Sequence, residues 1–562
     1  MKESDILKHA LRNAALHDGK AVVGAVIPKI LGEDPKLKSK MKELMPAVSK
    51  IVEEVNKLSL EKQKAELLTL DKHALDKKEE EAPKELPELK NIKVGKCSFR
   101  IPPGPEKELH IGHALSFLLN YYYAKRYKGK LILRFEDTNP EKCRQEFVNG
   151  IKQDLTALGI TWDEEYYMSD HLPEYYKLAE KMIKKGDVYI CNCVEDKISK
   201  DRENHVRCGC AEKDVNGNLR EWNKMKYGTY KEGTCVLRLK GDLKNKNSVM
   251  WDPSLFRINR TKHYRQGSKF FVWPLYDFTA AVEDAKITHV LRDSNWTQRV
   301  ELQDFIRKKL GIKGKPVNVL YSRYQLEGAV TQGRIIRKLV EDKVVDGYDD
   351  IRLATVKGLL RRGFVPETFM QILIEMGISK SQRTIPLEKL YSINSRILDK
   401  KVDRYFFVED PVLLTVNDAP GANVELPMTP YDAKRTRKVD TEGEFYIPKR
   451  DAKTGLVLLK YAYNVKIIKV TPNGAVGEYV IEKTIKDVPI IQWIAKNNEV
   501  PIIVKEPLPM FNDKEELNKV TMAEHKGFAE RIVEGLPVGA QVQFERFAFC
   551  KKDKDYWNFT HK

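Results

Sequence analysis

The sequence has no long apolar run and few of the marks of a secreted chain. No stretch approaches the roughly 20 apolar residues that a bilayer-spanning helix needs, so we expect no membrane segment. The first residues, 1–5, are polar and lack the apolar stretch of a signal peptide. There are only eight cysteines, and four of them fall in two close pairs. In the cytoplasmic chain that we expect, such pairs favour a metal site over disulfides.

Acidic residues are outnumbered by basic ones. The chain has 99 Lys and Arg against 81 Asp and Glu, a formal net charge of +18. A large polyanion such as RNA is a natural partner for this surplus, although a Lys-rich proteome would give the same count. The 562 residues exceed what a single core accommodates, so three or more domains are expected.

The pattern of apolar residues changes along the chain. Up to about residue 90 it has helical spacing, and Pro46 should kink or split one of the helices. Residues 77–90 are charged and contain two prolines, which predicts a linker. The pattern is helical again over 351–393. Beyond about residue 404, many short strands at close spacing predict β-barrels.

A strand, a helix and a second strand follow one another after the linker. Residues 97–101 and 131–135 predict buried strands on either side of a helix, which together make a parallel βαβ unit. His110-Ile111-Gly112-His113 lies where the first strand leads into the helix, at the edge where parallel sheets bind ligands. The N-terminus of a helix favours phosphate there. The two histidines can donate hydrogen bonds to phosphate oxygens, and Gly112 leaves room for a flat adenine ring.

Two cysteine pairs, Cys191-Asn192-Cys193 and Cys208-Gly209-Cys210, are separated by fourteen residues. Four thiolates around a tight turn suit a tetrahedral zinc ion. His205 is an alternative ligand, but its charged neighbours favour a surface position. We therefore predict a Zn²⁺ site at the four cysteines.

These motifs resemble those of archaeal-type glutamyl-tRNA synthetases, class I aminoacyl-tRNA synthetases that share their architecture with glutaminyl enzymes. The tetrad at 110–113 is similar to the HIGH signature of the class. Further blocks, in the same order as in the family, cover nearly the whole chain: 100–114, 133–140, 273–278, 288–292, 346–350, 361–363 and 558–562.

The resemblance implies an α/β fold with a split Rossmann-like catalytic domain, a helical N-terminal extension and C-terminal β-barrels. It also implies six regions. In chain order these are a helical extension and linker (1–95), the first catalytic half (96–190), an acceptor-binding insertion with the zinc site (191–270), the second catalytic half with a degenerate ATP loop (271–345), a helical connector (346–400) and anticodon-binding β-barrels (401–562).

The resemblance further implies that the chain joins glutamate to the 3′ end of tRNA(Glu) at the expense of ATP, with tRNA(Gln) as a second candidate acceptor. Mg²⁺ would bridge the triphosphate. The roles that it implies are catalysis by His110, His113 and Arg334, ATP binding by these three with Gly112, and glutamate binding by Arg100, Glu136, Tyr276 and Arg292. Guanidinium groups suit the two carboxylates of glutamate, and Glu136 would receive its ammonium group.

The sequence departs from the family in its ATP loop. Gly333 stands where the family has a catalytic lysine, and only Arg334 of the usual basic residues persists there. Lys107 replaces a small residue ahead of the first motif. We predict an active but slowed enzyme, in which Gly333→Lys speeds adenylate formation.

Three other functions stay open. A different nucleotidyltransferase with an HxGH loop is disfavoured by the long β-rich C-terminal region. A non-catalytic paralogue would keep the RNA surfaces and lose the ATP loop. Against a glutaminyl enzyme we argue that an amide substrate would leave the buried guanidinium of Arg292 without a counter-charge.

Overall fold

The computed structural model describes residues 3–16, 19–33, 41–70, 85–379, 383–472, 474–482, 487–512, 514 and 516–562. It consists of two compact units, Met1–Lys84 and Glu85–Lys562. Most of the expected linker at 77–90 lies outside the described residues. Within those residues, no helix combines the length and the apolar character needed to cross a membrane.

The first unit is helical, as predicted, and has a core of its own that includes Leu11, Val26 and Val48. One helix passes through Pro46 without a break, so the predicted split is wrong. The buried amide of Gln63 donates hydrogen bonds to the backbone carbonyl groups of Gly19, Val55 and Leu58. The helices are α1 (Glu3–Leu16), α2 (Val23–Glu33), α3 (Met41–Asn56) and α4 (Leu60–Leu70).

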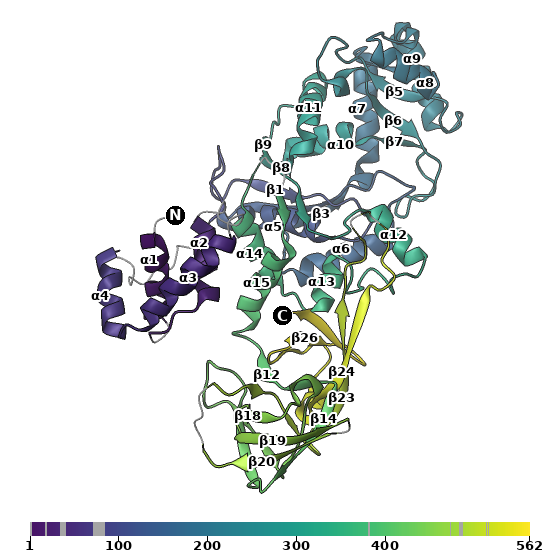
Figure 1. Ribbon diagram of the computed structural model, residues 1–562. Helices are drawn as coiled ribbons and strands as arrows, with labels where there is room; N and C mark the ends of the chain where they lie inside the picture. The colour runs from purple at the N-terminus through teal and green to yellow at the C-terminus, as the bar shows by residue number, and fades with distance from the viewer. Residues whose placement is uncertain are drawn as a thin grey trace. The chain divides into compact units, whose positions relative to one another are not determined.

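The second unit begins with the predicted βαβ arrangement (Figure 1). Strands β1 and β2 pair in parallel, with Ile101 opposite Leu133, and β2 pairs in parallel with β3. β8 and β9 form a second parallel pair, and β1 and β8 begin side by side, where Ser98 and Thr288 exchange hydrogen bonds of 2.8 and 3.0 Å. The elements are β1 (Ser98–Ile101), α5 (Ile111–Arg126), β2 (Lys130–Phe135), α6 (Gln145–Ala157), β3 (Glu164–Tyr167), β8 (His289–Asp293) and β9 (Val317–Tyr321).

A mostly antiparallel insertion separates the two parallel pairs. Its four strands follow one another in the sheet, and their core contains the fully buried rings of Trp222, Phe256 and Trp273. Its elements are α7 (Leu172–Lys184), β4 (Val188–Cys191), α8 (Glu195–Glu203), α9 (Val215–Lys226), β5 (Val236–Leu239), β6 (Ser254–Ile258), β7 (Val272–Pro274) and α10 (Tyr276–Glu283). Helix α11 (Thr297–Leu310) connects β8 to β9 and packs against the same core.

Helices connect the parallel strands of the second unit to the C-terminal strands. Thr560 of the last strand binds both backbone and side chain of Arg362: its Oγ1 donates to the Arg362 carbonyl at 2.8 Å, and its own carbonyl accepts from the guanidinium at 3.1 Å. The elements are β10 (Tyr324–Leu326), α12 (Gly333–Glu341), α13 (Val356–Arg362), α14 (Pro366–Met376), β11 (Arg383–Ile385) and α15 (Leu387–Leu398).

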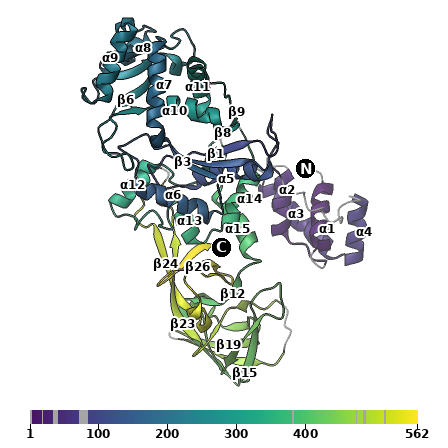
Figure 2. The same ribbon diagram turned by 180° about the vertical axis from the view of Figure 1, so that it is seen from behind.

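The C-terminal region consists of short strands, as predicted, in two seven-stranded sheets and one hairpin (Figure 2). The first sheet contains β12 (Asp403–Tyr405), β13 (Phe407–Glu409), β23 (Glu499–Pro507), β24 (Met522–Glu530), β25 (Gln541–Phe544), β26 (Ala548–Lys552) and β27 (Trp557–His561). The second contains β14 (Pro411–Asn417), β17 (Glu444–Pro448), β18 (Gly455–Leu459), β19 (Asn464–Thr471), β20 (Gly474–Val480), β21 (Ile490–Ile491) and β22 (Ile494–Ala495), and the hairpin is β15 (Ala422–Pro427) with β16 (Thr436–Thr441).

Candidate active site and metal centre

The two histidines of the tetrad cap the N-terminus of α5. The Nδ1 atom of His110 accepts the N–H of Gly112 at 3.1 Å, and Nδ1 of His113 accepts the N–H of His110 at 3.3 Å. In a neutral imidazole one nitrogen accepts and the other carries the proton. Each ring is therefore protonated on Nε2, which leaves one donor on each histidine for a ligand.

Burial keeps both rings neutral at physiological pH. It lowers the pKa of His110 to about 3, with further lowering by the charges of Lys107 and Arg323. The same causes, together with His110 itself, hold the pKa of His113 well below its ordinary value. The pair can thus donate hydrogen bonds to an anion without carrying charge.

Gly112 has a structural reason to lack a side chain. A Cβ there would lie 2.9 Å from the carbonyl oxygen of Tyr324 and 3.0 Å from the His110 ring. The close approach of β10 to α5 therefore requires glycine, whatever ligand lies beside it.

A cavity of about 350 Å³ lies beside this motif. The predicted glutamate-binding residues and the predicted ATP-binding residues of the tetrad all line it: Arg100, His110, Gly112, His113, Glu136, Tyr276 and Arg292. Trp296 and Arg323, which the sequence did not single out, also line it. The exception among the predicted residues is Arg334, which is exposed in the first turn of α12 and does not line the cavity.

The floor of the cavity is a buried ion cluster centred on Asp284. Its carboxylate accepts from Arg134 at 2.8 Å, from Arg292 at 2.5 Å and from Arg100 at 3.3 Å. Arg134 also binds Glu136 at 2.8 Å. Three guanidinium groups and two carboxylates leave one uncompensated positive charge (3 − 2 = +1).

The argument against a glutaminyl enzyme is wrong, because Arg292 is already paired with Asp284. Arg292 already has a carboxylate partner in Asp284 and an amide partner in Gln303, whose Oε1 it binds at 2.9 Å. An uncharged substrate would therefore not leave this guanidinium without a counter-charge.

The cluster also explains two pKa shifts of opposite sign. Burial raises the pKa of Asp284, but the charges of Arg134, Arg100 and Arg292 outweigh it and hold that pKa well below its ordinary range. For Glu136 burial dominates and its pKa is raised, although Arg134 and Arg100 oppose the shift. Asp284 therefore stays ionised, whereas a further cation nearby would favour the ionised form of Glu136.

The sequence carried a weak signal for Arg134 and Asp284, the two cluster residues that the sequence analysis did not single out. Arg134 interrupts the apolar strand β2, and Asp284 follows the largely apolar helix α10. A charge at such a position needs a buried partner. Which partner it finds depends on the packing of strands and helices far apart in the sequence.

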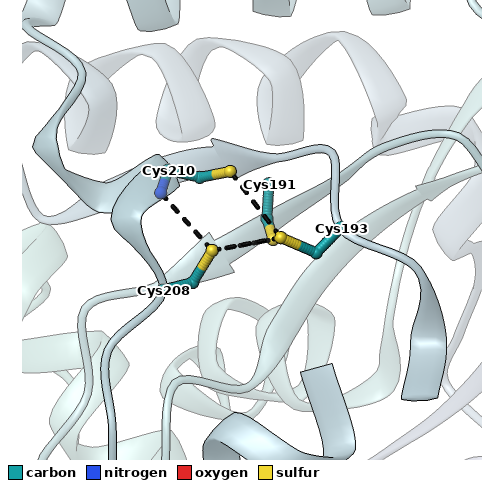
Figure 3. A group of neighbouring side chains, drawn as sticks. All are labelled: Cys191, Cys193, Cys208 and Cys210. Carbon is teal, nitrogen blue, oxygen red and sulfur yellow. Dashed lines mark hydrogen bonds between the residues drawn. The ribbon is translucent and has the colours of Figure 1, made fainter. Parts of the chain in front are cut away.

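The four predicted cysteines meet in one place (Figure 3). Their sulfur atoms all lie within 4.8 Å of one another, with Cys193 3.2 Å from Cys208 and 3.9 Å from Cys210. Tetrahedral zinc–thiolate bonds of about 2.3 Å place the sulfurs about 3.8 Å apart, so this donor set fits zinc. His205 is exposed, and its Nδ1 lies 2.7 Å from the Leu243 carbonyl.

Two N–H groups lie within hydrogen-bond distance of the cysteine sulfurs. The backbone N–H of Cys210 points to the sulfur of Cys208 at 3.4 Å, and the guanidinium of Arg238 lies 3.8 Å from the sulfur of Cys191. Donors of this kind stabilise thiolates and orient metal ligands.

Comparison with known families places these sites in context. The family described as "tRNA synthetases class I (E and Q), catalytic domain" matches residues 96–400. The chain belongs to this family. Two models of the anti-codon binding domain of the same class match residues 402–485 and 490–553, which contain most of the C-terminal strands.

Similar proteins extend over the full chain of this class I tRNA synthetase. A glutamate–tRNA ligase of Pyrococcus furiosus is 38% identical over 98% of this chain and 96% of its own length. One of Nitrosopumilus maritimus is 36% identical over 99% of both chains. A solved glutamate–tRNA ligase of Elizabethkingia meningosepticum has 18% identity and a TM-score of 0.41, and covers 54% of this chain and 70% of its own.

The departures of this synthetase from its family meet in space. A Cβ on Gly333 would lie 2.6 Å from Cδ of Lys107. The glycine of the ATP loop and the new lysine ahead of the histidine tetrad are thus neighbours. The predicted gain from Gly333→Lys does not take this contact into account.

Proposed function

We propose that this synthetase is a glutamate–tRNA ligase, which activates glutamate with ATP and transfers it to the 3′ end of tRNA(Glu). The observation that carries the proposal is the buried cluster around Asp284, whose net charge of +1 opens into the cavity beside the histidine tetrad. Full-length similarity to glutamate–tRNA ligases supports the same substrate. tRNA(Gln) stays a second candidate acceptor.

Glutamate carries a net charge of −1 and so neutralises the excess of the cluster. In our proposal its carboxylates lie toward Arg100 and Arg292, its ammonium toward Glu136, and Tyr276 forms a wall of the site. Because Glu136 has its pKa raised by burial, a cationic ammonium group beside it is favourable. Glutamine carries no net charge and would leave the excess uncompensated in a buried site.

Activation begins when an α-carboxylate oxygen of glutamate attacks the α-phosphorus of ATP. The bond to the β-phosphate breaks, and pyrophosphate leaves with the electron pair. His110 and His113 would donate their Nε2 protons as hydrogen bonds to the phosphate oxygens, where negative charge gathers. Mg²⁺, when bound with ATP, would neutralise part of the charge of the triphosphate. The terminal ribose hydroxyl of tRNA then attacks the carbonyl of the adenylate, which forms the ester bond, releases the hydroxyl proton and expels AMP.

Zinc at Cys191, Cys193, Cys208 and Cys210 would have a structural role. Four protein ligands complete a tetrahedral site and leave no position for a substrate. The ion would join the end of β4 to the turn at 208–210 and so order the insertion that the resemblance assigns to the tRNA acceptor end. Arg334 stays a predicted pyrophosphate ligand, and the cytoplasm stays the predicted location.

The test is ATP–pyrophosphate exchange with glutamate or glutamine, each with and without tRNA. We expect exchange with glutamate, and charging of tRNA(Glu) in the second step. Exchange that prefers glutamine would overturn the substrate. If no exchange occurs with either amino acid while tRNA is still bound tightly, the chain is a non-catalytic paralogue.

A further inference from the structure

Lys107 and Gly333 are neighbours, and the lysine side chain lies where a side chain at 333 would begin. A Cβ on Gly333 would meet Cδ of Lys107 at 2.6 Å and its Cβ and Cγ at 3.7 Å. Any side chain at 333 must therefore displace the lysine from its present path. The lack of a side chain at Gly333 therefore leaves space that the side chain of Lys107 fills.

The Lys107 ammonium group has no carboxylate partner within salt-bridge distance among the residues that the structure describes. It is half-buried, and its charge and that of Arg323 both act on the histidine pair. Burial lowers the pKa of Lys107, the nearby charges of Arg323 and Arg337 lower it further, and the charge of Glu106 opposes the shift. A half-buried cation among other cations is unfavourable until an anion joins it.

The turn that carries Lys107 is held in place. Arg337 of α12 donates to the carbonyl of Glu106 at 3.1 Å, and the amide of Asn139 binds the Glu106 side chain at 3.1 Å. Arg323 lines the same cavity as His110 and His113. Lys107 does not itself line this cavity, but it lies close enough for its charge, like that of Arg323, to act on both histidines.

We propose that Lys107, supported by Arg323, is the cation that binds the β- and γ-phosphates of ATP in this protein, and that Gly333 makes room for it. The inference rests on the proposed function, since it names the phosphate-binding residue of the same site. When the oxygen of glutamate attacks the α-phosphorus and the bond to the β-phosphate breaks, the lysine ammonium neutralises the charge on the departing pyrophosphate. Lys107 would thereby take the role of the lysine that the family resemblance predicts at position 333.

The test is a set of variants at the two positions, measured by tRNA-dependent ATP–pyrophosphate exchange. Lys107→Met keeps the packing against Gly333 and removes the charge, so we expect a loss of about a hundred- to a thousandfold in rate, with the KM for glutamate unchanged. Lys107→Arg should retain more activity than Lys107→Met. Gly333→Lys alone should slow exchange, whereas the double variant Lys107→Ser with Gly333→Lys should recover part of the activity.

Controls separate this inference from the proposed function. Lys338→Ala removes an exposed lysine from the same helix α12 and should leave exchange unchanged. Each variant is also titrated calorimetrically with a non-hydrolysable ATP analogue and Mg²⁺, and its unfolding temperature is compared with that of the wild type. Exchange and analogue binding by folded Lys107→Met within threefold of the wild type would overturn the role of Lys107. Faster exchange by Gly333→Lys would overturn the role of Gly333. If the wild type exchanges with no amino acid, the proposed function fails, and analogue binding alone decides the role of Lys107.

Discussion

Asp284 binds the guanidinium of Arg292 at 2.5 Å while it also accepts from Arg100 and Arg134. Arg292, which lines the cavity, is thus already paired within a buried cluster. We therefore expect substitutions of Arg292 and of Asp284 to have different effects.

Arg292→Ala should lower the use of glutamate by about ten- to a hundredfold or more and largely spare tRNA binding. Loss of a charged hydrogen-bond partner costs about 1.5–3 kcal/mol, and the net charge of the cluster falls from +1 to zero. The measurement is kcat/KM for glutamate beside a tRNA-binding titration. Arg396→Ala, which removes a surface arginine paired with Glu375, is the control and should behave as wild type. Charging of glutamate by Arg292→Ala at wild-type efficiency would show that the residue does not bind it.

Asp284→Asn should destabilise the fold as well as the site, because it leaves three guanidinium groups with one carboxylate, Glu136. Removal of one partner from a buried ion pair costs about 3–5 kcal/mol. The expected result is a lower unfolding temperature. Asp403→Asn breaks a surface pair with Arg435 and should cost at most about 1 kcal/mol. Equal stability of the two variants would contradict a structural role for Asp284.

The purified protein should contain about one zinc per chain, held by the four cysteines. Cys193→Ser should lower the zinc content and make the insertion more open to proteolysis, because metal binding and local folding are coupled. Elemental analysis and limited proteolysis measure both effects. Cys550→Ala, a change at a buried cysteine of β26, should leave the zinc content unchanged. Protein that holds no zinc after metal-replete purification would overturn the site.

The stability of the fold should depend on pH through Asp154 of α6. Burial raises the pKa of this carboxyl to about 7, with Lys357 opposing the shift and Glu108 adding to it. In the unfolded chain it ionises near pH 4. Between these values the folded state binds more protons, so the free energy of unfolding falls as the pH rises from about 4 to about 7.

Asp154→Asn removes this dependence. Its advantage in free energy of unfolding over the wild type should therefore grow between pH 4.5 and pH 8, toward an upper bound of about 4 kcal/mol. Denaturant titrations at several pH values measure it. Asp196→Asn, at an exposed position in α8, should show no such trend. A constant difference across this range would mean that Asp154 is not shifted.

Local sequence patterns were sufficient for much of the fold. The βαβ unit, the helical first unit and the strand-rich C-terminal region follow from apolar periodicity and turn residues, which act over a few neighbours. The expected split at Pro46 does not occur, because a helix in a packed unit can continue past a proline. The cysteine pairs were equally readable, since their spacing along the chain limits where the thiols can meet.

The charges of the site could not be paired from the sequence. Arg100, Arg134 and Arg292 come from different strands, and only the packing of those strands against the end of α10 brings them to Asp284. The contact between Lys107 and Gly333 likewise joins segments far apart in the chain. The sequence by itself determined the elements and the residue types that bear the chemistry, because these depend on local backbone and side-chain preferences. The tertiary structure decided which charges neutralise one another, because electrostatic energy in a buried site depends on distances of a few ångströms that no local pattern encodes.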